Sequence, residues 1–348
     1  MSTNKEPASP SPIQPFEGPA LWRGGELAER SDWQHTLSEG ECQEIRAALE
    51  STQRDEVPLQ DITVKNFLLP TLAGQLGAAQ NSLEHGCGSF LMRGWPVGEH
   101  TLEGNRRVFW GLSQYLGTPI SQSAQGEKIF HVQDAGLSKG DSRVRGPNTR
   151  RALNFHCDRC DVIGFLCIHQ AKKGGESYLV SSPAIHNEML RHHPDLLALL
   201  YQSWYYKTHN VDLANDDLWC FQPVFAQVEG RFVSYILRVL IDRAYQLPEL
   251  PDMTRQQKKA LDTLDALCTD PSFHYSFTQE PGDMLFVNNF TNFHSRGAFE
   301  NHDDPARHRL LLRIWLSVPN SRPLPQSFSG SFGQTLAGSL RGGIHPAS

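Results

Sequence analysis

A histidine and an aspartate separated by one residue, His156 and Asp158, constrain this chain more than any other feature. In an extended backbone residues i and i+2 point to the same side, so both side chains can reach one metal ion. A third ligand has to come from elsewhere, and His294 follows an expected strand much further along the chain. Two imidazoles and one carboxylate form the facial triad of non-haem Fe(II) oxygenases. The pattern therefore predicts a metal site built from two distant β-segments.

Arg309 and Arg313 follow His294 by fifteen and nineteen residues, and Arg313 interrupts an otherwise apolar strand, RLLLRIWL. A buried guanidinium is costly unless an anion accompanies it, and a carboxylate is its natural partner. An iron triad with an arginine on a nearby core strand is what 2-oxoglutarate binding requires. The 1-carboxylate and keto oxygen would chelate Fe(II), the distal carboxylate would meet Arg313, and dioxygen would take the remaining position.

Three segments carry a resemblance to a known family: FHCDRCDVIGFLCIHQAKKGGESYLVSS, PGDMLFVNNFTNFHSR and DPARHRLLLRIWLS. With their order and the helices between them, roughly residues 80 to 320 resemble the taurine dioxygenase/TfdA family of Fe(II)- and 2-oxoglutarate-dependent dioxygenases. The resemblance implies metal ligands at His156, Asp158 and His294, a cosubstrate arginine at Arg313 with its companion at Arg309, and a cosubstrate-contacting hydroxyl at Ser177. One departure is Cys157, where the family commonly has threonine, and its side chain is expected to point away from the metal.

The residues between these motifs predict a β-rich core with helices outside it. Short runs of β-branched, leucine and aromatic residues predict strands at residues 162–168, 177–180, 232–237, 273–278, 283–287 and 310–318. Helical periodicity predicts helices at residues 36–50, 105–116, 183–201 and 254–268. The resemblance makes the core a distorted double-stranded β-helix, or jelly roll. The expected fold class is therefore β-rich α+β with flanking helices.

The two ends of the chain differ in composition from the body. Residues 1–15 are rich in Pro and Ser and predict a disordered tail. Residues 321–348 are rich in Gly, Ser and Pro and predict a C-terminal arm, either disordered or lying irregularly on the body. Residues 16–320 would then form a single dioxygenase domain.

Charge and cysteine usage exclude several classes of protein. The formal net charge of −6 argues against a nucleic-acid binder, which needs a basic surface. No apolar stretch approaches the roughly 18 residues of a membrane-spanning helix, and the N-terminus lacks the apolar region of a secretory signal. The odd number of cysteines does not fit a secreted disulfide framework. We therefore expect a cytoplasmic protein with reduced thiols, no nucleic-acid partner and no membrane partner.

An arginine-rich segment, residues 139–151, precedes His156. It is either a solvated loop or a segment that presents cations to the substrate. Together with Arg309 it favours a small-molecule substrate that carries an anionic group. The sequence does not name this substrate, and the resemblance also allows the chain to form a homo-oligomer.

Two other functions fit part of the same pattern. A cupin-type metal oxygenase would use the triad without 2-oxoglutarate, but it gives Arg313 no role. A non-catalytic redox- or ligand-sensing module would use Cys157 and Cys160, but it gives the intact triad no role. Burial of the two thiols as small apolar side chains explains them more simply. The sequence therefore predicts an oxidoreductase that hydroxylates or desaturates a small organic molecule while 2-oxoglutarate is converted to succinate and carbon dioxide.

Overall fold

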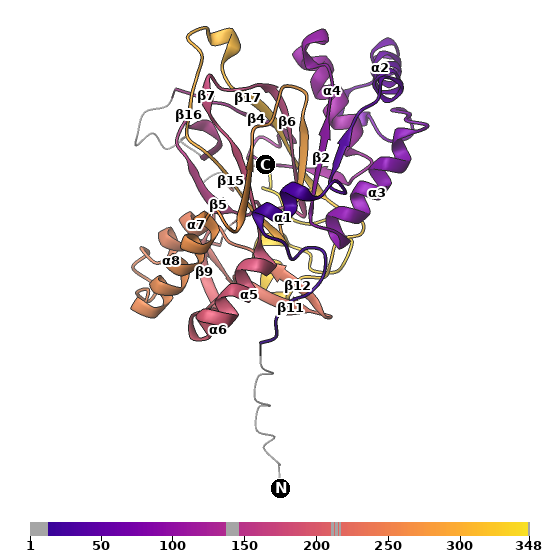
Figure 1. The fold of residues 1–348 in the computed structure, drawn as a ribbon. Helices are drawn as coiled ribbons and strands as arrows, with labels where there is room; N and C mark the ends of the chain where they lie inside the picture. Colours follow the sequence, from indigo (N-terminus) through magenta and orange to yellow (C-terminus); the bar gives the residue numbers. More distant parts are fainter. Residues whose placement is uncertain (1–12, 137–145, 210–211, 213–214, 216, 347–348) are drawn as a thin grey trace.

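The computed structural model describes residues 13–136, 146–209, 212, 215 and 217–346. Within this part of the chain, seven strands form a large sheet in the order β1-β2-β14-β6-β17-β3, with β4 also paired to β17 (Figure 1). Its strands are β1 (Gln34–Thr36), β2 (Ser89–Arg93), β3 (Thr118–Ile120), β4 (Ile129–Val132), β6 (Val162–His169), β14 (Met284–Asn288) and β17 (Leu310–Ser317).

A smaller sheet faces the large one and carries most of the residues of interest. Its order is β13-β8-β15-β5, and its strands are β5 (Leu153–His156), β8 (Ser177–Ser181), β13 (His274–Phe277) and β15 (Asn292–Arg296). Three short antiparallel ladders join β7 (Lys173–Gly174) to β16 (Phe299–Glu300), β9 (Ser203–Lys207) to β10 (Trp219–Pro223), and β11 (Phe225–Val228) to β12 (Arg231–Ser234).

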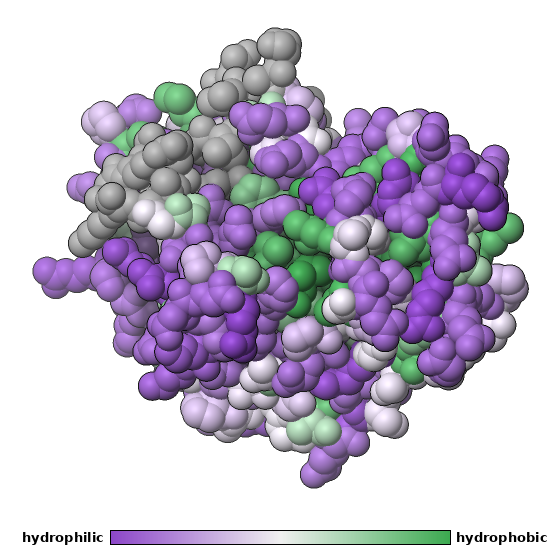
Figure 2. All heavy atoms as spheres, turned by 90° about the horizontal axis from the view of Figure 1, so that it is seen from above, coloured by the Kyte–Doolittle hydropathy of each residue, from purple (hydrophilic) through white to green (hydrophobic). Residues whose placement is uncertain are grey.

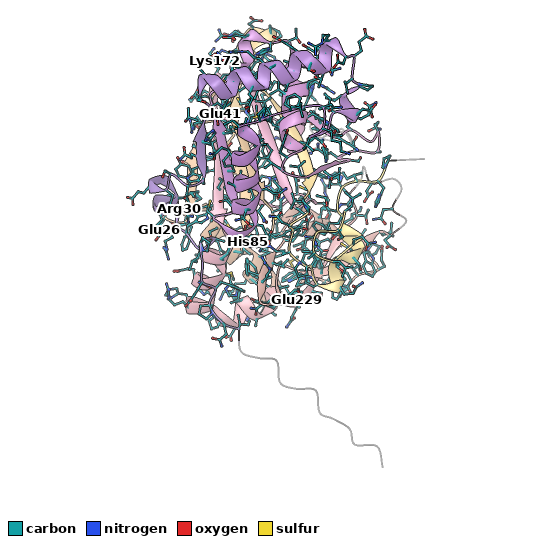
Figure 3. The ribbon with its side chains drawn as sticks, turned by 90° about the vertical axis from the view of Figure 1, so that its right-hand side faces the viewer. Glu26, Arg30, Glu41, His85, Lys172 and Glu229 are labelled. Carbon is teal, nitrogen blue, oxygen red and sulfur yellow. The ribbon has the colours of Figure 1, made fainter. Side chains whose placement is uncertain are left out.

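The alternation of side chains along β14 shows how the sheets are layered. Leu285 and Val287 belong to the core between the two sheets, together with Leu179 of β8. Met284 and Phe286 point the other way and pack under a helical layer. That layer consists of α2 (Glu39–Arg54), α3 (Leu72–His85) and α4 (Leu102–Ser113). Figure 3 faces it and labels Glu41 of α2 and His85 of α3.

A second layer covers the outer face of the small sheet. Phe155 and Val180 pack there against α5 (Ser182–His192), α6 (Pro194–Leu200) and α8 (Arg255–Thr269). The two helical layers lie on different sides of the sheets in Figure 1. The remaining elements are α1 (Gly24–Glu29), α7 (Arg238–Ala244), α9 (Ser329–Phe332), η1 (Leu59–Asp61), η2 (Val97–Glu99), η3 (Gly146–Asn148), η4 (Pro305–Arg307) and η5 (Gln326–Phe328).

The observed architecture confirms the expected jelly-roll class, with two local differences. The single helix expected at residues 183–201 is wrong, because the chain breaks at His193, where the backbone leaves the helical region before Pro194. Proline has no N–H to continue the helix and starts α6 instead. The strand expected at residues 232–237 ends at Ser234, and the chain then leads into α7.

The C-terminal arm lies against the body through residue 346. Its Arg341 Nε donates to Asp161 Oδ1 over 2.7 Å, and both side chains are buried. The backbone N–H of Gly343 donates to the carbonyl of Arg159, one residue beyond Asp158. Ordered hydrogen bonds therefore join this irregular segment to the loop that follows β5.

The surface of the described residues is mostly polar. Seen from above, hydrophilic side chains cover most of the molecule, and hydrophobic side chains gather in a hollow near the middle (Figure 2). Among the described residues, no helix is both long enough and apolar enough to cross a bilayer.

Candidate active site

Two neighbouring strands of the small sheet bring the predicted metal ligands together. His156 ends β5 and is the register partner of His294 on β15, and the two ring centroids are 4.4 Å apart. Asp158 follows two residues after His156, where the chain leaves the sheet. One ligand atom from each of the three side chains lies within 4.8 Å of the others. Antiparallel pairing thus brings residues far apart in the sequence to one point.

The hydrogen bonds of the histidines suit metal binding. His156 Nδ1 lies 2.7 Å from the carbonyl oxygen of Asn154, which can only accept, so Nδ1 carries a proton and Nε2 is the nitrogen left to face a metal. His294 Nε2 lies 4.0 Å from Asp158 Oδ2. Burial, the neighbouring His156 and Arg313 lower the pKa of His294 to about 3, so this imidazole is neutral and able to donate its lone pair.

Asp158 is held as a carboxylate. Burial alone would raise its pKa, but Arg313, His156, His294 and a hydrogen bond from Trp315 together lower it. Arg313 Nη1 and Trp315 Nε1 each donate to Asp158 Oδ2 over 3.2 Å. Such outer hydrogen bonds orient a metal-binding carboxylate. The donor set of two imidazoles and one carboxylate therefore fits a divalent iron ion.

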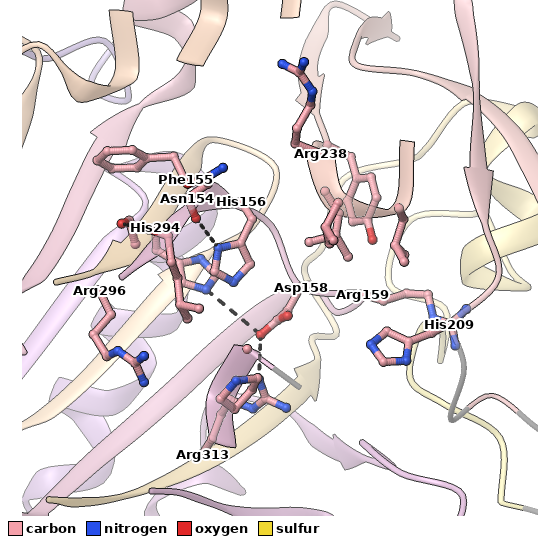
Figure 4. Close-up of a pocket in the computed structure, with 18 of the residues that line it drawn as sticks. Asn154, Phe155, His156, Asp158, Arg159, His209, Arg238, His294, Arg296 and Arg313 are labelled. Atoms are coloured by element: carbon pink, nitrogen blue, oxygen red, sulfur yellow. Dashed lines mark hydrogen bonds and ion pairs between the residues drawn. The ribbon is translucent and has the colours of Figure 1, made fainter. Parts of the chain in front are cut away.

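Arg313 is buried and extends from β17 toward the triad, as Figure 4 shows. Its Nε donates to Gln122 Oε1 over 2.7 Å, and its Nη1 donates to Asp158 Oδ2. Its Nη2 is buried and has no partner among the described residues. Two nitrogens of this guanidinium are thus bound to protein groups, and the third is left for a ligand of the cavity that Arg313 lines.

Arg309 is the residue that directly precedes β17. Its side chain is buried, and both Nε and Nη1 lack a partner among the described residues. It passes directly over the turn before Ser177, because a Cβ on Gly175 would lie 3.0 Å from Arg309 Nε. Gly175 has a φ of +78°, which also favours glycine. The Gly-Gly turn therefore makes room for the arginine beside Ser177.

Ser177 contributes a hydroxyl to the same region. Its Oγ donates to Gln279 Oε1 over 3.1 Å, which leaves the buried Gln279 Nε2 without a partner in the described structure. Gln279, Ser177, Arg309 and Arg313 all line one cavity of about 420 Å³, together with the three triad residues. The structure thus brings every sequence-predicted site residue into a single cavity.

Sequence reasoning missed further residues of this cavity. Arg296, two residues after His294 on β15, lies on one side of the triad in Figure 4, and Arg159 lies on the other side with His209. Arg159 Nη2 forms a 2.6 Å ion pair with the buried Asp212. The i and i+2 rule that linked His156 with Asp158 would also have placed Arg296 beside His294.

The buried thiols next to the triad have no sign of redox or metal chemistry. Burial raises the pKa of both Cys157 and Cys160, so they stay protonated. Cys157 belongs to the core under the helices, away from the cavity. All seven cysteines are free. The basic segment at residues 139–151 falls largely outside the described residues, although Arg150 pairs with Asp134.

Two imidazoles and a carboxylate that meet in a jelly roll, beside buried arginines with some nitrogens lacking a partner among the described residues, define a non-haem iron oxygenase that binds an anionic cosubstrate. Comparison with known proteins agrees. Residues 55–315 match the family model "Taurine catabolism dioxygenase TauD, TfdA family". This chain belongs to that family of Fe(II)- and 2-oxoglutarate-dependent dioxygenases.

Two curated relatives align over most of the chain. FR-33289 synthase of Streptomyces rubellomurinus is 29% identical over 325 residues, which cover 91% of this chain and 94% of the relative. Taurine hydroxylase-like protein SAT17 of Stachybotrys chartarum is 26% identical over 306 residues, covering 84% and 77%.

Solved structures share the fold at lower identity. Asparagine oxygenase in complex with Fe(II), hydroxyasparagine and succinate has a TM-score of 0.64 at 14% identity, covering 88% of this chain and 99% of that one. The non-haem iron oxygenase OrfP, in complex with Fe and 2-oxoglutarate, has a TM-score of 0.59 at 14% identity, covering 88% and 100%.

Proposed function

We propose that His156, Asp158 and His294 hold Fe(II) and that the enzyme hydroxylates a small organic molecule. The observation that carries this proposal is the meeting of the three ligand groups within 4.8 Å in a cavity that also holds unpaired buried arginines. Bound iron, 2-oxoglutarate and dioxygen would together supply the oxidation: one oxygen atom of dioxygen would enter succinate as 2-oxoglutarate loses carbon dioxide, and the other would be inserted into a substrate C–H bond. The protein's own residues orient the reactants and keep water out of the site.

We assign the two predicted cosubstrate arginines to different ends of 2-oxoglutarate. The sequence pattern gave the distal carboxylate to Arg313, but Arg313 is already hydrogen-bonded to Asp158 and Gln122 beside the triad. Its remaining Nη2 is better placed for the end of the cosubstrate that chelates the metal. Arg309, with two unpaired nitrogens beside Ser177, is the better partner for the distal carboxylate.

The substrate side of the cavity favours an anionic molecule. Three buried arginines (Arg296, Arg309 and Arg313) and a divalent metal carry more positive charge than Asp158 and a 2-oxoglutarate dianion can neutralise. Lys207 also lines this cavity, as does Arg159, whose charge is paired with that of Asp212. An anionic group on the substrate would offset this excess. The solved relatives bind hydroxylated asparagine and arginine, so amino acids and other small acids are the first molecules to screen.

The test is an anaerobic titration of the purified protein with Fe(II) and 2-oxoglutarate. We expect the weak visible charge-transfer band of the metal-bound keto acid. Asp158→Ala should lose the band, and Arg309→Leu should require more 2-oxoglutarate to reach it. Iron binding without a band would favour the cupin-type oxygenase, and absence of iron binding would favour the sensing module.

A second measurement addresses turnover. In air, the iron-loaded protein should release succinate from 2-oxoglutarate with uptake of dioxygen, and an accepted substrate should accelerate this release. Candidates with and without an anionic group should be compared at equal concentration. A preference for uncharged candidates would contradict the anionic substrate class while leaving the dioxygenase activity intact.

A further inference from the structure

Arg296 is a buried cation that the proposed reaction has not yet used. It lies on β15, two residues after His294, lines the same cavity and is 6% exposed. Its Nη2 donates to the carbonyl oxygens of Thr149 and Arg151, over 2.7 and 2.5 Å. These carbonyls lie just ahead of β5, the strand that ends at His156. One edge of the guanidinium is thus anchored to the backbone that leads into the triad.

The other edge has no partner. Nε and Nη1 of Arg296 are both buried without a hydrogen bond among the described residues. The carboxylate whose charge reaches Arg296, that of Asp134, is ion-paired with Arg150 at 3.0 Å. Burying two guanidinium donors without acceptors costs folding free energy, which indicates that an anion binds to this edge of Arg296.

Arg309 also has two buried donors without a hydrogen-bond partner among the described residues, and it contacts the same aromatic ring as Arg296. Both guanidinium groups contact the ring of Phe299, whose centroid is 4.9 Å from Arg296 Cζ and 5.1 Å from Arg309 Cζ. Nε and Nη1 are unpaired in each, and the buried Gln279 Nε2 adds a further unpaired donor in the same cavity. Two like charges that line one cavity repel each other, and one carboxylate bound by both would relieve the repulsion and satisfy the donors that have no partner among the described residues.

We infer that Arg296 is a second binding residue for the distal carboxylate of 2-oxoglutarate, which it shares with Arg309. This inference rests on the proposed function. Arg159, the arginine across the triad in Figure 4, is already paired with Asp212, so it is not a competitor for the same carboxylate. Because Arg296 also binds the carbonyls of Thr149 and Arg151, an occupied cosubstrate site would stabilise the segment that leads into β5 and His156.

The experiment uses a pair of keto acids that differ at one end. 2-Oxopentanoate has a methyl group where 2-oxoglutarate has its distal carboxylate, so both can chelate iron and only one can use the arginines. Anaerobic titrations of the Fe(II)-loaded protein give a dissociation constant for each. In Arg296→Gln we expect the affinity for 2-oxoglutarate to fall about 10- to 100-fold, as for a lost charged hydrogen bond, and the affinity for 2-oxopentanoate to change less than about 3-fold. Arg296→Lys should lose less.

The control is Arg191→Gln, because Arg191 lies on α5, is not among the residues that line the cavity, and has a side chain that is 64% exposed. It should leave both affinities unchanged. Amide hydrogen exchange gives a second readout that does not depend on turnover. 2-Oxoglutarate should slow exchange at residues 151–156 in the wild type and not in Arg296→Gln.

The outcomes separate the inference from the proposed function. Equal losses for the two keto acids would give Arg296 a purely structural role and overturn the inference, as would an unchanged affinity for 2-oxoglutarate. If Arg296→Gln does not fold, the test uses Arg296→Lys. A smaller preference of this variant for 2-oxoglutarate over 2-oxopentanoate would support the inference, and an unchanged preference would refute it. Absence of a band in the wild type with either keto acid would instead refute the proposed function.

Discussion

The ion pair between Arg341 and Asp161 offers the sharpest test of how the C-terminal arm is held. The two side chains are 0% and 1% exposed, and the contact is 2.7 Å. Arg341 Nη2 also donates to the carbonyl of Arg322 over 2.8 Å. Replacing Arg341 by Met keeps most of the side-chain volume but leaves the Asp161 carboxylate buried without its cation. Breaking a buried pair in this way costs about 3–5 kcal/mol of unfolding free energy.

The cost should depend on pH. Burial already raises the pKa of Asp161 in spite of Arg341, and removing the arginine raises it further. The native variant then binds a proton in a pH range where the unfolded chain has released it. Its unfolding free energy therefore increases as pH falls toward about 5. The deficit relative to wild type should be largest near pH 8 and smaller near pH 5.5.

Urea denaturation of the metal-free protein at several pH values measures this deficit. The matched variant is Arg341→Met combined with Asp161→Asn, which removes the stranded charge but keeps an oxygen to accept from Val318 N–H. It should recover at least half of the lost free energy. A deficit below about 1 kcal/mol, a deficit that does not change with pH, or no recovery in the double variant would refute the reasoning.

Three further predictions follow from the site and its surroundings. Trp315→Phe removes the hydrogen bond to Asp158 and should weaken Fe(II) binding about 10-fold, as seen by competition with a chelator; unchanged affinity would contradict an orienting role. Gly175→Ala should destabilise the protein by about 1–2 kcal/mol and weaken 2-oxoglutarate binding, because the positive φ and the 3.0 Å approach to Arg309 both disfavour a side chain. An unchanged thermal unfolding temperature together with an unchanged 2-oxoglutarate titration would disprove this prediction. Burial lowers the pKa of His186 to about 4, so the unfolded state binds more protons than the native state between about pH 6.5 and 4, and stability decreases as the pH falls through that range. His186→Gln should flatten that part of the pH profile in denaturant titrations, and an unaltered slope would argue against this reasoning.

The meeting of the three proposed ligand residues could be expected from the sequence because part of its signal is local and chemical. His156 and Asp158 share one extended segment, His294 follows a recognisable strand, and the resemblance to the family linked the two. The strands of the large sheet were predictable for the same kind of reason. Residues such as Leu285 and Val287 alternate with Met284 and Phe286, and both faces of β14 are buried, which produces a continuous apolar run.

What escaped prediction depends on tertiary contacts. An arginine on a strand is equally compatible with the surface and with a cavity, so Arg296 gained meaning only when its unpaired nitrogens could be seen. The proposed assignment of Arg309 and Arg313 to different ends of 2-oxoglutarate also needed the structure, because it depends on which arginine is hydrogen-bonded to Asp158. The arm has no periodicity at all, and its place is set by single contacts such as that of Arg341 with Asp161.

The position of the arm affects the order in which the protein can mature. Ile344 lines the cavity, and Gly343 is hydrogen-bonded to the residue after Asp158, so residues near the end of this sequence help to build the pocket around the triad. Synthesis proceeds from the N-terminus, and earlier segments fold first. The metal pocket can therefore close only after the residues up to Ile344 have left the ribosome. Iron loading is thereby coupled to the synthesis of the arm that contains Ile344.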